Sequence, residues 1–265
     1  MTSSAPDTDD DRSDRRVGRR DVTEWRSRTG QRLAERHRSL ADRVGDHRAL
    51  VGTLAVGVAV AAAASFGASR IYDGVTSRNG IESLDGPALA LGKRLRSPAL
   101  DAAAAGIARG FGPVGMPILA LGGALALASR ERHLTPLTLM TAAGAGSLAM
   151  TLAGKGIIHR NRPHRRDAIP PYEKSPSFPS GHTLNATTVL GTAAYLVALQ
   201  QRRTGPQAAT VGAAAATAVT VGLSRVLLGA HWFTDVAVGW TTGTGWLALV
   251  ITSHRLYLTS QDARG

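Results

Sequence analysis

The clearest pattern in the sequence is a series of long windows that contain no charged residue. Each window is about 18 to 21 residues long, roughly the length that an α-helix needs to cross the hydrocarbon core of a membrane. The windows are 49–69, 110–129, 134–154, 183–201, 204–224 and 236–253. Alanine and glycine are common in them, which permits close helix packing. The pattern predicts an all-α fold: an integral membrane bundle of six transmembrane helices.

The segments outside these windows differ in character. Residues 1–20 alternate Asp and Arg with few apolar residues, which predicts disorder. Apolar residues recur at loosely helical spacing over 22–44, as in either a surface helix or a solvated tail, and a second stripe over 81–95 fits an interfacial helix or a connector. We therefore expect three parts: a disordered to amphipathic cytoplasmic arm (1–48), a six-helix membrane domain (49–255) and a short cytoplasmic tail (256–265).

The distribution of charge predicts an orientation in the membrane. The net charge of +12 would suggest nucleic-acid binding in a soluble protein, but here much of the arginine lies in the N-terminal arm and in short loops, so we expect no nucleic-acid partner. With six spans, the arm, the loops at 130–133 and 202–203 and the C-terminal tail share one side. By the positive-inside rule this side is the cytoplasm, and the protein is a multi-pass protein of the cytoplasmic membrane. The opposite loops are also basic, which an anion-binding site would explain.

Two absences narrow the chemistry. The chain has no cysteine, which excludes disulfides, thiolate catalysis and cysteine-ligated zinc. It also has no obvious acidic metal-binding cluster, so we expect neither a metal ion nor a cofactor. Candidate chemistry lies in three clusters of basic, hydroxyl and carboxylate side chains.

The first cluster of such side chains follows the third predicted span. Lys155 ends this span, where it could be a membrane anchor or part of a site. Arg162 favours a site, because its planar guanidinium can hold two phosphate oxygens while Lys155 supplies a point charge. The intervening and following basic residues are better explained as a solvated basic loop: His159, Arg160, His164, Arg165 and Arg166.

The second cluster, Pro179-Ser180-Gly181-His182, directly precedes the fourth predicted span. Ser180 is expected to cap the helix and Gly181 to permit the turn. A helix N-terminus also binds anions, because its amide groups are free and its dipole is positive. His182 would then lie beside the anion, in position to give a proton to a leaving oxygen.

The third cluster lies between the fifth and sixth predicted spans. It comprises Ser224-Arg225, then His231, then Asp235. The four-residue step from His231 to Asp235 puts both side chains on one helix face, where the carboxylate can hold one imidazole nitrogen and leave the other to attack. The alternative is that Asp235 caps the helix and His231 is an interfacial loop residue.

Together, these clusters resemble the signature of a known family. In order and spacing, Lys155-x6-Arg162-Pro163, Pro179-Ser180-Gly181-His182 and Ser224-Arg225-x5-His231-x3-Asp235 are similar to the signature of the type 2 phosphatidic acid phosphatases. These enzymes are also called lipid phosphate phosphatases, and they share their active site with the vanadium haloperoxidases. No signature position departs from the pattern, and the resemblance covers about residues 50–254.

The resemblance implies a role for each of these residues. His231 would be the nucleophile that forms a phosphohistidine, and Asp235 would orient it. His182 would protonate the leaving lipid alcohol and then activate water. The groups that hold the phosphoryl oxygens would be Lys155, Arg162, Arg225, Ser180 and the amide of Gly181. Such a site neutralises charge without magnesium, and members of the family resemble metal-independent enzymes.

We therefore expect a phosphatase whose active site lies at the extracytoplasmic ends of the third to sixth spans. Its partners would be the bilayer and a lipid phosphate, with phosphatidic acid, phosphatidylglycerol phosphate and polyprenyl diphosphates such as undecaprenyl diphosphate as candidate substrates. Two alternatives remain. Six spans count against a vanadate-dependent haloperoxidase, and intact His182, His231 and Asp235 count against a catalytically silent lipid-binding or transport protein.

Overall fold

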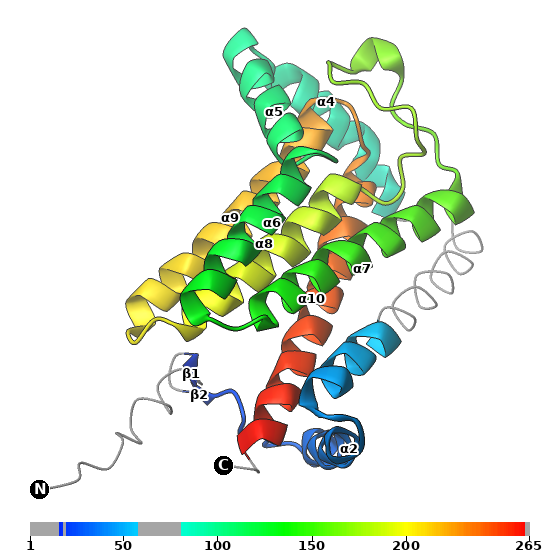
Figure 1. Ribbon diagram of the computed structural model, residues 1–265. Coiled ribbons are helices and arrows are strands. Elements are labelled where there is room, and N and C mark those ends of the chain that lie inside the picture. The colour runs from blue at the N-terminus through cyan, green and yellow to red at the C-terminus, as the bar shows by residue number, and fades with distance from the viewer. Residues whose placement is uncertain (1–15, 18–19, 58–80, 263–265) are drawn as a thin grey trace, which may run out of the picture.

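The computed structural model describes residues 16–17, 20–57 and 81–262 of the chain, and this part is mainly helical (Figure 1). The α-helices are α2 (Arg28–Val44), α4 (Asp85–Leu95), α5 (Pro98–Gly110), α6 (Gly115–Glu131), α7 (Thr135–Ile158), α8 (Gly181–Leu199), α9 (Thr204–Leu227) and α10 (Phe233–Asp262), and residues 46–57 are also helical. Two 3-10 turns, η1 (Ile81–Leu84) and η2 (Arg165–Asp167), and the two-residue strands β1 (Arg16–Val17) and β2 (Arg20–Asp21) complete the elements. The all-α prediction is confirmed, apart from this short antiparallel strand pair.

Helix α8 lies at the centre of the bundle, where it packs against α6, α7, α9 and α10. Its contact with α10 is close because two glycines of α10 face it. A Cβ atom at Gly239 would lie 3.0 Å from Thr183 Cβ, and one at Gly243 would lie 2.9 Å from Thr187 Cβ. The two glycines are one helical turn apart, so they form a smooth stripe that brings the two backbones together.

Three helices of the described part are long and apolar enough to cross a membrane: α7, α9 and residues 233–261 of α10. A fourth span is possible if α5 and α6, which meet at a bend of 58°, count as one. The predicted window 110–129 therefore includes the bend, and α6 begins only at Gly115. The window 49–69 lies partly outside the described residues. The prediction of six spans thus stays a prediction.

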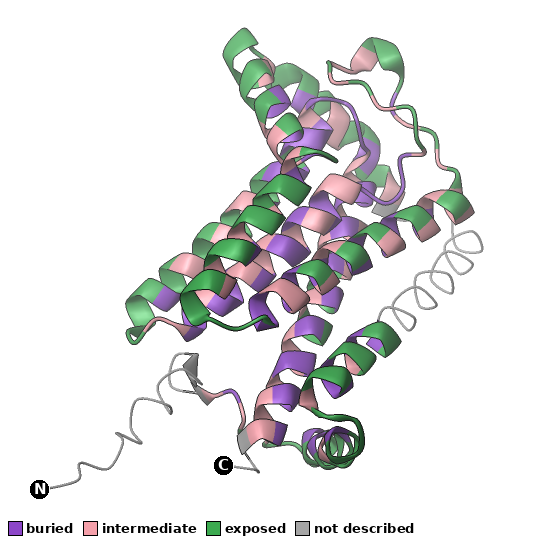
Figure 2. Ribbon diagram, in the orientation of Figure 1, coloured by how far each residue is buried: buried purple, intermediate pink, exposed green. Residues whose placement is uncertain are grey.

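The surface of the bundle is suited to lipid. Large apolar side chains are exposed along the outer helices, among them Ile118, Leu125, Leu152, Val219 and Leu223. In Figure 2 these outer helices carry much exposed surface, while buried positions gather on the faces that point inward. Apolar side chains exposed in this number are typical of a surface in contact with acyl chains.

The N-terminal arm packs against the far end of α10. The indole nitrogen of Trp25 donates to Thr259 Oγ1 at 3.0 Å, and Arg255 donates to the carbonyls of Val22 and Glu24. Ser27 caps α2 by accepting from the Gly30 amide, and of the two alternatives for residues 22–44 the structure shows a helix, over Arg28–Val44. The disorder predicted for residues 1–20 falls mostly outside the described residues. Most of the tail segment at 256–265 continues α10, which ends at Asp262.

The opposite end of the bundle brings four helix termini together. There α7 and α9 end while α8 and α10 begin, and the long loop 159–180 runs across them (Figure 1). Helix α4, the amphipathic stripe expected at 81–95, fixes this end: Arg96 donates to the carbonyls of Leu227 and Asp167, and Lys93 pairs with the Asp167 carboxylate. The three signature clusters therefore meet at one end of the molecule.

Candidate active site

The centre of the site is the carboxylate of Glu173, a residue of the loop that joins α7 to α8. Its Oε2 accepts from Arg162 Nη2 at 2.7 Å, and its Oε1 accepts from Arg225 Nη2. His182 Nδ1 lies 3.6 Å from Oε1, and His231 Nε2 lies 3.8 Å from Oε2. Four signature residues from three separate clusters thus surround one anionic group.

The electrostatics of Glu173 follow from these neighbours. Burial by itself raises the pKa of this carboxyl group, but Arg225, His231, Arg162 and His182 lower it, and the net result is a pKa of about 2. The carboxylate is therefore ionised under all ordinary conditions. A pocket that holds one carboxylate so strongly has the charge to hold a phosphoryl group.

The two arginines come from different elements. Arg225 lies in the last turn of α9 and is completely buried, yet its Nε and Nη1 atoms have no hydrogen-bond partner in the described part of the protein. Arg162 lies in the loop and donates through Nη1 to the Ala230 carbonyl at 2.6 Å. Buried donors without partners are costly. The Arg225 guanidinium can therefore donate further hydrogen bonds to the oxygens of a bound anion.

His231 and Asp235 lie at the start of α10. His231 precedes the helix, after a turn at Gly229, where a φ of +64° and a close approach to the Asp167 carbonyl require glycine. His231 Nδ1 lies 3.4 Å from Asp235 Oδ2. The other nitrogen, Nε2, lies 3.1 Å from Arg162 Nη1. A guanidinium can only donate, so Nε2 accepts and the imidazole proton resides on Nδ1, facing Asp235.

The protonation state of His231 is set mainly by burial. Burial lowers the pKa of His231 to about 4, against the opposing influence of Asp235. The imidazole is therefore neutral at pH 7, with an available lone pair on Nε2 that points toward Glu173 and Arg162.

His182, in the first turn of α8, is oriented by a backbone carbonyl of α5. Its Nε2 lies 3.1 Å from the Ala108 oxygen. A carbonyl can only accept, so Nε2 carries the proton and Nδ1 is the atom that faces Glu173. The imidazole can thus exchange a proton at Nδ1 with a group that occupies the position of Glu173.

The capping expectation for Ser180 is wrong in its detail. Ser180 is the residue before α8, but its side chain makes no capping hydrogen bond. Its hydroxyl instead pairs with the Thr183 hydroxyl at 2.8 Å, and its amide donates to the Asp235 carbonyl at 3.1 Å. The start of α8 is therefore tied to the start of α10, while Gly181 packs against Thr151 of α7.

Lys155 lies in the last turn of α7, as expected, but it does not contact Glu173. Its ammonium donates to Ser175 Oγ at 3.0 Å and to the Pro176 carbonyl. Lys155 thus supports the loop segment that carries Glu173, because Ser175 is two residues after Glu173 in the chain. Of the eight residues proposed from the sequence, the contacts around Glu173 and His231 join five: Arg162, His182, Arg225, His231 and Asp235. Lys155, Ser180 and Gly181 lie outside these contacts.

Two residues at the site were not expected from the sequence, and one was assigned differently. Glu173 and Asp85 gave no signal, because each belongs to a segment without a recognisable motif. Arg160, interpreted as part of a solvated basic loop, instead pairs with Asp235 at 2.6 Å and with Asp85 at 2.6 Å. The other four members of that basic group, His159, His164, Arg165 and Arg166, are exposed, as the default interpretation expects.

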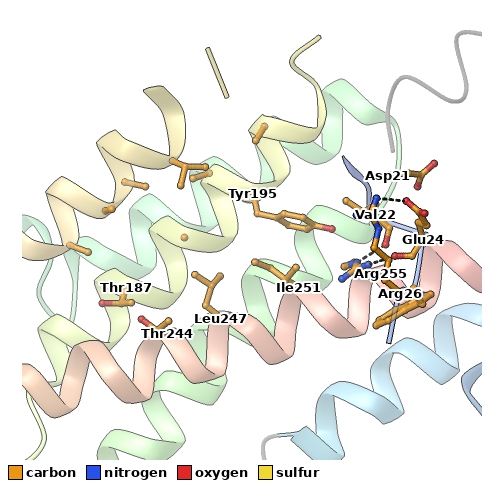
Figure 3. A pocket seen from close by; sticks show the side chains of 18 of the residues that line it. Asp21, Val22, Glu24, Arg26, Thr187, Tyr195, Thr244, Leu247, Ile251 and Arg255 are labelled. Atoms are coloured by element: carbon orange, nitrogen blue, oxygen red, sulfur yellow. Dashed lines mark hydrogen bonds and ion pairs between the residues drawn. The ribbon is translucent and has the colours of Figure 1, made fainter. Parts of the chain in front are cut away.

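A cavity of about 620 Å³ adjoins the site. Lys155, Glu173 and His182 line its polar side, and apolar residues such as Leu148 and Leu152 of α7 line the other. A second cavity, of about 780 Å³, lies at the opposite end of the bundle beside the N-terminal arm and contains no signature residue (Figure 3). We therefore assign the chemistry to the smaller cavity, which has a charged end and an apolar end.

Comparison with known proteins agrees with this geometry. Residues 134–257 match the family model of the PAP2 superfamily. The resemblance to this superfamily is therefore confirmed. Phosphatidylglycerophosphatase B from Bacillus subtilis (strain 168) is 39% identical to the chain over 87 residues, which are 32% of this chain and 42% of that relative.

A solved structure extends the likeness. The crystal structure of a transmembrane PAP2-type phosphatidylglycerolphosphate phosphatase from Bacillus subtilis is similar to this chain, with a TM-score of 0.60 and 26% identity. The match covers 76% of this chain and 93% of that one. Together with the apolar helices, this likeness identifies the chain as a multi-pass membrane protein with phosphatase relatives.

Proposed function

We propose that the protein is a lipid phosphate phosphatase that acts through a phosphohistidine on His231. The observation that carries this proposal is the convergence of Arg162, Arg225, His182 and His231 on the Glu173 carboxylate. A phosphoryl group in the place of this carboxylate would meet two guanidinium groups and lie beside both imidazoles. The names of the matched Bacillus sequence and of the matched Bacillus structure support the same class of reaction.

In the first half of the proposed reaction, Nε2 of His231 attacks the phosphorus atom. The bond between phosphorus and the lipid oxygen breaks. In the substrate complex His182 carries a second proton on Nδ1 beside the one on Nε2, and it gives this Nδ1 proton to the lipid oxygen, which leaves as an alcohol. Asp235 holds the Nδ1 proton of His231 and stabilises the positive charge on the imidazole. Glu173 must leave the site first, and Arg162 must shift from Nε2 to a phosphoryl oxygen.

In the second half, a water molecule attacks the phosphohistidine. His182 takes the proton from the water, the bond between phosphorus and nitrogen breaks, and the electron pair returns to Nε2 of His231. Inorganic phosphate then leaves. Throughout, Arg162, Arg225 and Lys155 neutralise the phosphoryl oxygens, helped by the Gly181 amide and Ser180 at the start of α8. This charge supply is the basis for proposing that the reaction needs no metal ion.

The cavity supports a lipid as the substrate. Its charged side suits a phosphate group, and its apolar lining from α7 and from the turn between α5 and α6 suits acyl or prenyl chains. We place phosphatidylglycerol phosphate beside phosphatidic acid and undecaprenyl diphosphate as candidates, because the matched relatives are named for the first. The positive-inside rule supports a site on the extracytoplasmic side.

The test is phosphate release by the detergent-purified full chain in excess chelator, with each of the three lipids. We expect release that persists in chelator and disappears in His231→Ala, while the exposed loop variant His164→Ala keeps wild-type activity. Release that depends on an added metal ion would overturn metal independence. Full activity in His231→Ala would overturn the proposed nucleophile, and no release from any of the lipids would overturn the proposed function.

A further inference from the structure

Arg160 connects the proposed nucleophile to a second buried carboxylate. It follows the end of α7, and its side chain is only 17% exposed. Its Nη1 donates to Asp235 Oδ1 at 2.6 Å and to Thr234 Oγ1 at 2.7 Å. Its Nη2 donates to Asp85 Oδ2 at 2.6 Å. One guanidinium therefore bridges residues of α4 and α10.

Asp85 holds both Arg160 and the first turn of α10. Its Oδ1 accepts from the Thr234 amide at 2.8 Å, and its Oδ2 also accepts from Thr234 Oγ1 at 2.8 Å. An acceptor for the first amides of a helix is normally a local capping residue. Here α4 supplies it from 149 residues away, so the amphipathic connector fixes the start of the helix that carries Asp235.

The geometry around Asp235 shows what the bridge accomplishes. The Asp235 carboxylate is completely buried, with Arg160 on Oδ1. Its other oxygen, Oδ2, accepts from the Trp232 amide at 3.0 Å and faces His231 Nδ1 at 3.4 Å. Rotation of the carboxylate would break these contacts, so the bond from Arg160 fixes the oxygen that His231 meets.

We propose that Arg160, itself held by Asp85, is a positioning residue that fixes the Asp235 carboxylate and thereby the direction of the His231 Nε2 lone pair. Arg160 holds Asp235 Oδ1, and the other oxygen of the same carboxylate faces His231 Nδ1, so the influence of Arg160 on the imidazole passes through Asp235. This inference rests on the proposed function, but it concerns a contact outside the family signature.

The bridge also has an electrostatic consequence. The charged and titratable groups that face His231 are Arg162 and Glu173 from the loop, His182 from α8, Arg225 from α9 and Asp235 from α10. Arg160 offsets the negative charge of Asp235, so its removal would make protonation of His231 easier. Loss of the Asp85 charge would have the opposite effect, because it removes one of the carboxylates that share Arg160 with Asp235, while Glu82 remains 3.7 Å from Arg160 Nη2.

The experiment compares Arg160→Gln, Arg160→Lys and Asp85→Asn in the full-length protein. Arg166→Gln is the matched control, because the Arg166 side chain lies in the same loop and is 80% exposed. Phosphate release from short-chain phosphatidic acid gives kcat and KM as a function of pH. The imidazole of His231 is followed separately by nitrogen NMR of histidine-labelled protein, assigned with His231→Gln.

We expect Arg160→Gln to lower kcat by about 10- to 100-fold, with KM changed by less than about threefold, as for other groups that orient a reactive side chain. In Arg160→Gln, the titration midpoint of His231 and the acid limb of the kcat/KM profile should both move to higher pH by about one unit. Arg160→Lys should keep part of the activity and a His231 titration midpoint close to that of the wild type. Asp85→Asn should move the midpoint to lower pH.

Other results would overturn the inference. A rise in KM without a fall in kcat would make Arg160 a substrate contact. If His231 titrates at the same pH in Arg160→Gln as in the control Arg166→Gln, Arg160 has no influence on the nucleophile. If Arg160→Gln does not fold, Asp85→Asn decides: a His231 titration that does not move to lower pH in this variant would overturn the inference. If the wild type releases no phosphate, the proposed function fails, whereas the NMR titration still tests the link from Arg160 to His231.

Discussion

Glu173 occupies the position that the proposed reaction assigns to the phosphoryl group, so it should compete with any anion that enters the site. We consider Glu173→Gln, which removes the charge, and Glu173→Ala, which removes the whole carboxylate. In both variants Arg162 and Arg225 lose their carboxylate partner. Substrate and product phosphate would then bind without first displacing a side chain.

The size of the effect follows from the contacts that an entering anion must break. Glu173 accepts charge-assisted hydrogen bonds from two guanidinium groups, and one such bond has a net value of about 1.5–3 kcal/mol. When Glu173 leaves, water molecules hydrogen-bond to the two arginines and offset part of the loss. We therefore take the value of one hydrogen bond as the net free energy needed to displace Glu173. An anion should then bind about 10- to 150-fold more tightly in Glu173→Ala, with a smaller gain in Glu173→Gln.

The assay is inhibition of phosphate release by orthovanadate and by inorganic phosphate, checked by calorimetric titration of the same anions without substrate. Glu35→Gln is the matched control, since Glu35 is exposed on α2 at the opposite end of the protein. An inhibition constant that is unchanged or weaker in Glu173→Ala would refute the competition. A large loss of kcat with unchanged anion affinity would instead give Glu173 a part in catalysis.

Three further predictions follow from the same structure. Asp235→Asn should lower kcat by about 10³- to 10⁴-fold at little cost in KM, measured by phosphate release, because an amide cannot hold the Nδ1 proton of His231 in the same way. The pKa of Glu173 lies at about 2 instead of 4.5, so the ionised carboxylate should stabilise the fold above pH 4.5 and lose this effect as the pH falls toward 2. The melting temperatures of the wild type and of Glu173→Gln should therefore converge as the pH falls through that range. Gly243→Leu should destabilise the protein by about 1–3 kcal/mol in detergent unfolding, since a Cβ atom there already lies 2.9 Å from Thr187; an unchanged melting temperature would contradict the close packing of α8 on α10.

The parts of the fold that the sequence predicts well are those set by local pattern. Charge-free windows place α7 and α9 to within a few residues of their ends. The central helix is less well described by hydropathy: α8 is surrounded by other helices, so it tolerates polar residues such as Asn185 that would be costly against lipid. The bend between α5 and α6 was missed, because charge alone does not detect the Gly-Phe-Gly-Pro run at 110–113.

The site likewise contains some residues that the sequence indicates and others that only the structure reveals. The sequence offers Arg162, His182, Arg225, His231 and Asp235 as candidates, because each lies at or near the edge of a predicted span and fits the family signature. The partners of these residues could not be predicted: Glu173 is 52 residues from Arg225, and Asp85 is 75 residues from Arg160. Charged residues in loops are usually solvated, so only the tertiary arrangement shows which of them are buried in ion pairs.

The central claim is that His231 carries the phosphoryl group during turnover. The most direct measurement is rapid quenching of the wild-type protein with a lipid phosphate under alkaline conditions, followed by peptide mass spectrometry. The account predicts one phosphoryl group, alkali-stable and acid-labile, on His231, and none in His231→Ala. Turnover with the phosphoryl group on another residue, or with no phosphoryl enzyme at any quench time, would contradict it.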